Sequence, residues 1–126
     1  MAVPEFHRFL RPVLETAQDG IVRHWREYER AAIERFALTD EDLRQLLPGG
    51  GRTRVADRLQ WALTYLRKAR LLENVARGRS QITARGTLYL AEAPAEIRPK
   101  DLLQFEEFAD FANCARSLAG GAGPSR

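Results

Sequence analysis

The chain has 126 residues, of which 44% are hydrophobic and 29% are charged, a balance typical of one globular domain with a single core. No apolar run approaches the roughly 18 residues of a membrane-spanning helix, and the N-terminal residues lack the basic start and apolar stretch of a secretory signal. The one cysteine, Cys114, excludes an internal disulfide and favours a cytoplasmic location.

The net charge is only +3, but the charged residues are unevenly distributed. From Arg44 to Arg85 ten residues are basic and only Asp57 and Glu73 are acidic, so this stretch carries +8 and the rest of the chain −5. This asymmetry favours a polyanionic partner, because phosphate neutralisation and counterion release supply most non-specific affinity for DNA. The alternative is an arginine-rich surface that is simply solvated.

The first part of the chain predicts three helices separated by short breaks. Apolar residues at helical spacing predict a helix over 6–17, followed by a short strand at Ile21-Val22 and a second helix over 25–36. A third, short helix begins at Thr39, whose side chain can cap it. Residues 40–47 are either the first helix of a helix-turn-helix or an insertion before it. In the second case the helix over 25–36 is the supporting helix.

The next helix is the most informative element. From Thr53 to Arg70 there is no proline or glycine, which permits a helix of about five turns. Its apolar residues have the spacing of a buried face: Val55, Leu59, Ala62, Leu66 and Ala69. On the opposite side a polar row is expected to face solvent: Thr53, Asp57, Gln60, Thr64 and Lys68. A polar row flanked by arginines is the chemistry of a helix that reads base edges.

Two strand-like segments, 71–76 and 80–83, flank Arg77-Gly78-Arg79 and predict a β-hairpin with a basic tip. A helix followed by a basic hairpin is the order of a winged helix. A helical segment near 87–91 and a last amphipathic helix around 102–112 follow. The expected fold is therefore mainly α (α+β), a winged helix-turn-helix with an antiparallel hairpin wing and extra N- and C-terminal helices.

Four segments of the sequence resemble the N-terminal domain of the Mrr family. Mrr proteins are restriction systems that cut modified, typically methylated, DNA. The four segments are Met1-Ala2-Val3-Pro4-Glu5-Phe6, Leu46-Leu47-Pro48-Gly49-Gly50-Gly51-Arg52, Trp61-Ala62-Leu63-Thr64-Tyr65-Leu66-Arg67-Lys68-Ala69 with Leu71-Leu72, and Ile82-Thr83-Ala84-Arg85-Gly86. The resemblance covers roughly residues 1–113 and leaves 114–126 as a flexible linker or tail. One departure is Arg70, where the family usually has a glycine before the two leucines.

The resemblance implies a DNA-binding domain that reads double-stranded, methylated DNA for a type IV restriction endonuclease. In that family a nuclease domain of the PD-(D/E)xK kind follows, but here Lys100 has no carboxylate two residues before it. We therefore expect a non-catalytic domain, tethered to a nuclease in a longer parent protein. A homodimer is left open. The alternatives are a stand-alone winged-helix transcriptional regulator and a protein-interaction or dimerisation module.

The candidate DNA-binding residues lie on the helix that begins at Thr53 and at the hairpin tip. Arginine suits guanine or phosphate, and Gln60 suits adenine, whereas Asp57 suits either a cytosine amino group or a neighbouring arginine. The hairpin tip suits phosphate or minor-groove contacts. The full expected set is Arg52, Thr53, Arg54, Asp57, Arg58, Gln60, Thr64, Lys68, Arg77 and Arg79.

Aromatic residues four apart on this helix, Trp61 and Tyr65, suggest a stack for an extruded base, but such pairs more often pack against a neighbouring helix. By the same reasoning Phe105, Phe108 and Phe111 are expected to dock on the core or on a second copy of the domain.

Other site chemistry is not indicated by the sequence. His7, His24 and Cys114 are too scattered for a metal site, so no metal and no cofactor is expected. Gly49-Gly50-Gly51 lacks the Lys-Ser/Thr that completes a phosphate-binding loop and predicts a turn.

Overall fold

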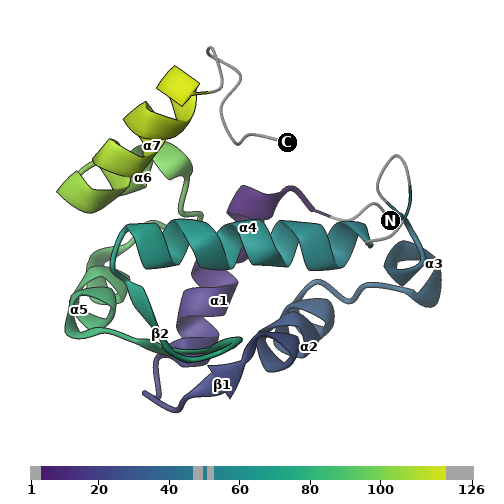
Figure 1. The fold of residues 1–126 in the computed structure, drawn as a ribbon. Coiled ribbons are helices and arrows are strands. Elements are labelled where there is room, and N and C mark those ends of the chain that lie inside the picture. Colours follow the sequence, from purple (N-terminus) through teal and green to yellow (C-terminus); the bar gives the residue numbers. More distant parts are fainter. Residues whose placement is uncertain (1–3, 47–49, 51–52, 119–126) are drawn as a thin grey trace.

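The computed structural model describes residues 4–46, 50 and 53–118, and Figure 1 shows their arrangement. The helices and strands are, in chain order, η1 (Phe6–Phe9), α1 (Leu10–Ala17), β1 (Arg23–His24), α2 (Trp25–Arg35), α3 (Asp40–Leu43), α4 (Arg54–Lys68), β2 (Leu72–Ala76), β3 (Arg79–Ile82), α5 (Ala84–Glu92), α6 (Pro99–Leu102) and α7 (Glu106–Leu118).

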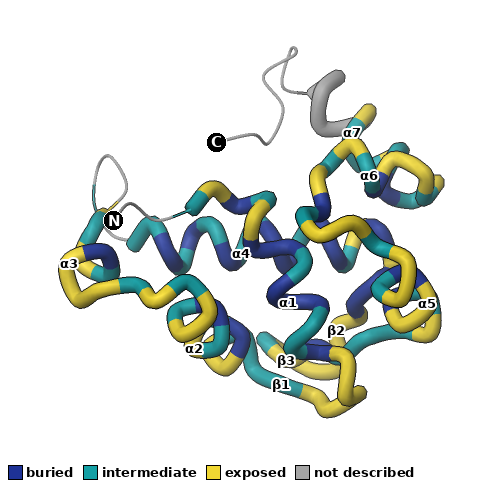
Figure 2. The backbone as a smooth tube through the Cα atoms, turned by 180° about the vertical axis from the view of Figure 1, so that it is seen from behind, coloured by how far each residue is buried: buried dark blue, intermediate teal, exposed yellow. Residues whose placement is uncertain are grey.

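Helix α4 lies across the middle of the molecule, with α1 crossing it and α7 above its C-terminal end (Figure 1). The core forms where α1 and α4 meet, and Leu10, Leu14, Leu59 and Leu66 are all 0% exposed there. Each buried leucine contributes about 2 kcal/mol through removal of its apolar surface from water. Figure 2 shows the buried residues following these two helices, while exposed residues follow the outer elements.

The sheet has three antiparallel strands in the order β1-β3-β2. Strands β2 and β3 form the predicted hairpin, which turns at Gly78 with φ +71°, a value that glycine adopts without steric cost. The Trp25 backbone N–H donates to the Gly78 carbonyl (2.9 Å), so the tip lies against the start of α2. The expected strand at Ile21-Val22 is displaced along the chain, because the paired residues are those of β1, Arg23–His24.

The helical elements and the small antiparallel sheet confirm the expected fold class. Helix α3 has only four residues, and α2 packs against both α1 and α4. The supporting helix is therefore α2, and α3 lies in the connection between α2 and α4. Helix α2 is capped at its N-terminus by His24, whose Nδ1 accepts from the Arg26 backbone N–H (3.2 Å).

Helix α4 ends in a left-handed turn. The prediction extends the helix to Arg70, but it stops at Lys68 and Arg70 has φ +63°. The Leu71 backbone N–H donates to the Leu66 carbonyl (2.9 Å), and the Arg70 N–H donates to the Arg67 carbonyl (3.0 Å). This pair of hydrogen bonds is the Schellman motif, which favours glycine at the position that Arg70 occupies here.

The C-terminal helices extend beyond the expected ones. Helix α7 continues to Leu118, past the expected domain boundary at residue 113. Residues 119–126 of the expected tail lie outside the described residues. In the part of the chain that is described, no helix has both the length and the apolar character needed to cross a membrane.

Candidate nucleic-acid interface

The core-facing side of α4 is confirmed by the structure, but the predicted polar row is only partly correct. The five apolar residues predicted to be buried are between 0% and 2% exposed: Val55, Leu59, Ala62, Leu66 and Ala69. Of the predicted polar row, Lys68 is exposed and Thr53, Gln60 and Thr64 are partly exposed. Asp57 is only 3% exposed, so the prediction that it faces solvent is wrong.

One flank of α4 is covered by aromatic packing. The Tyr65 ring centroid lies 4.8 Å from that of Phe6, 5.2 Å from that of Phe108 and 5.8 Å from that of Phe111. The Trp61 ring meets Tyr65 edge-on at 6.2 Å. Tyr65 is only 5% exposed, and burial raises the pKa of its hydroxyl. Packing against a neighbouring helix, the more common role of such pairs, is therefore confirmed for Tyr65.

The polar residues of α4 lie on two parts of its surface. The Lys68 ammonium lies 5.4 Å from the centre of the Phe111 ring, so this exposed side chain lies beside α7. Gln60, Thr64 and Arg67 follow one another at intervals of four and three residues, which places them in a second row along the helix. We call these three residues the open row.

Arg67 is the member of the open row that sequence reasoning missed. Its Nη1 donates to Asn74 Oδ1 on β2 (3.2 Å), and its Nη2 donates to Thr64 Oγ1 (3.2 Å). Burial lowers the pKa of its guanidinium, although arginine stays charged at neutral pH. The spacing from Gln60 and Thr64 is a signal that could have found it, because residues three and seven apart share a helix face.

The N-terminal half of α4 uses its predicted site residues partly for structure. Thr53 is the N-cap, and its Oγ1 accepts from the Ala56 backbone N–H (3.1 Å). The Arg58 Nη1 donates to the Pro4 carbonyl (2.9 Å), so this side chain points to the segment before η1. Arg54 is partly exposed. Arg52 lies outside the described residues.

The hairpin keeps its basic residues at the surface. Arg77 and Arg79 are both exposed, on either side of Gly78. Because Gly78 is hydrogen-bonded to the start of α2, the backbone of the tip is fixed while the two guanidinium groups remain accessible. The placement agrees with the predicted basic wing.

In a comparison with protein families, the Mrr N-terminal domain matches residues 6–92. The chain belongs to this family. The match runs from the first residue of η1 to the last residue of α5, so it includes α4 and the hairpin, whereas α6 and α7 lie outside it. A search of characterised proteins and a search of solved structures found no match. The predicted resemblance is confirmed: the chain carries the N-terminal domain of an Mrr-type restriction system.

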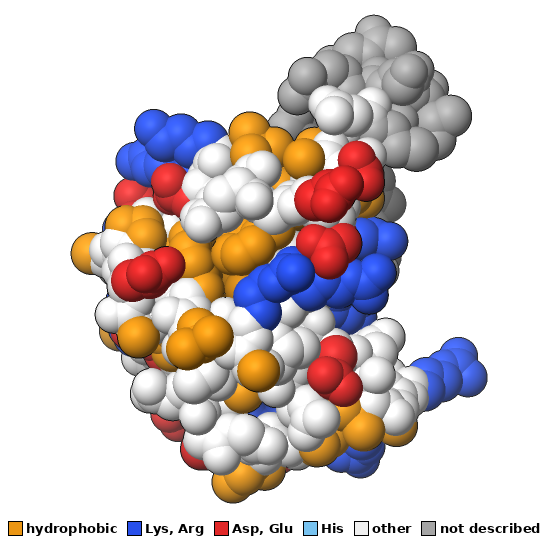
Figure 3. Space-filling model, turned by 90° about the vertical axis from the view of Figure 1, so that its left-hand side faces the viewer, with side chains coloured by type: hydrophobic (Ala, Val, Ile, Leu, Met, Phe, Trp, Pro, Cys, Tyr) orange, Lys and Arg blue, Asp and Glu red, His pale blue; other side chains and the backbone are white. Residues whose placement is uncertain are grey.

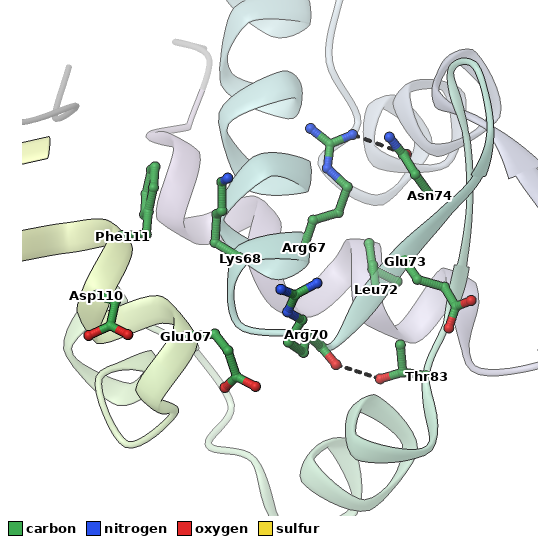
Figure 4. Close-up of a pocket in the computed structure, with 10 residues that line it drawn as sticks. All are labelled: Arg67, Lys68, Arg70, Leu72, Glu73, Asn74, Thr83, Glu107, Asp110 and Phe111. Carbon is green, nitrogen blue, oxygen red and sulfur yellow. Dashed lines mark hydrogen bonds between the residues drawn. The ribbon is translucent and has the colours of Figure 1, made fainter. Parts of the chain in front are cut away.

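Beside the open row, this Mrr N-terminal domain has a hollow of about 990 Å³ between the end of α4, β2 and α7 (Figure 4). Arg67, Lys68 and Arg70 lie along its α4 side, and Glu107 and Asp110 project from α7 opposite them. Figure 3 shows Lys and Arg side chains gathered between acidic groups on this face of the molecule.

The acidic side of the hollow, on α7, is hydrogen-bonded to α5. Arg85 Nη1 donates to Glu107 Oε1 (2.8 Å), and this hydrogen bond is the main cause that lowers the pKa of the Glu107 carboxyl. Within the described part of the chain, no three His, Cys, Asp or Glu side chains are grouped so that they could hold a metal ion.

Proposed function

We propose that this domain binds double-stranded DNA with the open row of α4 in the major groove and the wing on the adjacent backbone. The domain, expected over residues 1–113, delivers a nuclease tethered beyond it to methylated DNA. In this role the domain performs no catalysis itself.

The observation that carries the proposal is the open row itself. Gln60, Thr64 and Arg67 supply donors and acceptors on one face of a 15-residue helix, in a fold where the equivalent helix reads base edges. Gln pairs with adenine and Arg with guanine through two hydrogen bonds each.

The surrounding charge supports the same orientation. Arg70 at the end of α4 and Arg77 and Arg79 on the wing are all exposed. Arginines around a reading helix hold the DNA backbone and fix the register, while the helix supplies the sequence contacts. Membership of the Mrr N-terminal domain family supports DNA as the polyanion and modified DNA as the target.

The proposal is tested by measuring the affinity of the full chain for matched methylated and unmethylated duplexes across a salt series. We expect affinity to fall steeply with salt and the methylated duplex to bind more tightly. A variant with Arg77→Ala and Arg79→Ala is expected to lower the slope of log K against log salt by about 2, because each lost phosphate contact lowers it by about 0.9.

The matched control removes two arginines from another part of the surface. Arg8 and Arg35 pair with Glu96 (3.5 Å) and Glu15 (2.6 Å) on the side of η1, α1 and α2, so Arg8→Ala with Arg35→Ala should leave the slope nearly unchanged. An equal decrease of the salt slope in both double variants would indicate general charge attraction, without a defined DNA-binding face on the domain. Absence of binding to either duplex at low salt would reject DNA binding.

A further inference from the structure

The guanidinium of Arg67 is held in one orientation by groups from two elements. Thr64 Oγ1, one turn back on α4, accepts from Nη2, and Asn74 Oδ1 on β2 accepts from Nη1, both at 3.2 Å. Figure 4 shows Arg67 and Asn74 facing each other between the end of α4 and β2. Because arginine has only donors, the oxygen of the Asn74 amide must face it.

Asn74 is itself fixed by the hairpin and by the core. It lies opposite Ser80 in the register of β2 and β3, and Ser80 Oγ donates to the same Asn74 Oδ1 (3.2 Å). Ser80 is 4% exposed, and its carbonyl accepts from the hydroxyl of Tyr28 (3.1 Å), which is 1% exposed. Hydrogen bonds therefore run from the buried face of α2 through β3 and β2 to the surface of α4.

The neighbouring basic groups are not held in this way. Lys68 lies over the Phe111 ring, and the exposed Arg70 lies near the acidic side of the hollow, where its charge helps to lower the pKa of Glu107. A contact to phosphate needs mainly a positive charge, whereas a base edge must be met by two donors in a fixed plane. Arg67 has such a fixed plane, and N–H groups not engaged by Thr64 and Asn74 remain on it.

We propose that Arg67 reads a guanine edge in the major groove and that Asn74 is the positioning residue that sets its orientation. The inference rests on the proposed DNA binding and adds the base read and the residues responsible. Holding the side chain before binding removes an ordering cost that a free arginine would incur on contact.

The test begins with a selection of duplexes from a random library by the wild-type full chain. For each variant, the dissociation constants for the selected duplex and for a scrambled duplex are then compared, and the ratio measures discrimination. We expect Asn74→Ala to reduce this ratio about tenfold, with the affinity for the scrambled duplex and its salt slope within twofold of wild type. Asn74→Asp keeps the acceptor and should retain the ratio, even where its added charge weakens both duplexes.

Two further variants separate positioning from charge and from folding. Arg67→Lys keeps the charge but lacks the planar fork, so it should lose discrimination as Asn74→Ala does. Glu73→Ala changes an exposed neighbour on the same strand and should leave the ratio unchanged. Thermal unfolding of each variant checks that the domain is folded at the assay temperature.

The outcomes distinguish this inference from the proposed function. If the wild type discriminates and Asn74→Ala or Arg67→Lys leaves the ratio unchanged, the positioning role is wrong while DNA binding stands. If duplexes bind but the selection enriches no sequence, base reading by Arg67 is likewise rejected and DNA binding again stands. If the wild type binds no duplex, both proposals fall.

Discussion

The two sides of α4 carry similar polar residues but have different surroundings. On one side Gln60, Thr64 and Arg67 form the open row beside the wing, whereas on the other Tyr65 and Lys68 lie beside α7. The covering rings, Phe108 and Phe111, lie outside the segment that matches the Mrr N-terminal domain. A helix outside the matched segment therefore helps to bury Tyr65 on this flank of α4, while Lys68 beside it stays exposed.

The largest effect on stability is expected from removing an aromatic ring that packs on Tyr65. Phe108 is 2% exposed and its ring centroid lies 5.2 Å from that of Tyr65. Phe108→Ala should lower the free energy of unfolding by about 3 kcal/mol, through lost burial and the cavity left behind. Chemical denaturation measures this loss. DNA affinity should be retained in conditions where the variant is folded, because the open row is not touched.

Gln60→Ala, the matched variant on the open row, is expected to do the opposite of Phe108→Ala: it should weaken DNA binding and leave stability nearly unchanged. Its side chain is partly exposed, so the free energy of unfolding should change by less than about 0.5 kcal/mol while DNA affinity falls. If Phe108→Ala weakened binding as strongly as Gln60→Ala does, the division between the two sides of α4 would be wrong.

The second effect concerns the close contact between α5 and the segment that follows α4. A Cβ on Gly86 would collide with the backbone carbonyl of Leu71 and lie 2.7 Å from Ile82 Cγ1. Gly86→Ala should therefore cost about 2 kcal/mol of unfolding free energy, because the backbone after α4 has to shift. Leu88→Ala, at a side chain that is 74% exposed in the same helix, is the control and should cost little. Thermal melts of the two variants give the comparison.

The third effect is a gain in stability at the end of α4. Arg70 has φ +63°, a conformation that costs a residue with a Cβ about 1 kcal/mol and glycine almost nothing. Arg70→Gly should therefore raise the free energy of unfolding by about 1 kcal/mol, measured by denaturation. Arg70→Ala removes the same charge but keeps the strained backbone. Equal stability of the two variants would contradict the conformational explanation.

Much of this arrangement follows from local patterns in the sequence. Apolar spacing located α4 and its buried face, and the glycine between two strand-like segments located the hairpin. These features depend on neighbours within a few positions along the chain, which is the range that sequence patterns describe. The end of α4 was not located in this way, because Arg70 adopts a positive φ that the residue itself does not indicate.

The error at Asp57 has its physical origin in packing between separate elements of the chain. Asp57 is only 3% exposed because of segments packed around α4, and helical periodicity within α4 does not include them. Arg67 is a different case, because its spacing from Gln60 and Thr64 already places it on the same helix face and its partner Asn74 lies only seven residues further along the chain. Helical periodicity predicts the direction in which each side chain leaves the helix axis. Which of these side chains face solvent depends on the elements packed against the helix.

The smallest expected effect concerns the ion pair between Glu107 on α7 and Arg85 on α5. Glu107 accepts from Arg85 (2.8 Å) and so ties α7 to α5, and its pKa is lowered mainly by that hydrogen bond. The stabilisation is therefore fully present above the unfolded carboxyl pKa of about 4.3 and is lost as pH falls through the lower folded value. Both groups are well exposed, so the gain is small.

Glu107→Gln should be less stable than wild type at neutral pH, and the difference should shrink below about pH 4.3 and disappear at lower pH. Glu106→Gln is the matched control, because Glu106 is also in the first turn of α7 and its loss removes the same favourable interaction with the helix dipole. Denaturation of the three proteins at several pH values measures the effect. A pH-independent difference for Glu107→Gln would show that the carboxylate charge does not hold α7 in place, which would leave the aromatic packing on Tyr65 as the contact that covers this flank of α4.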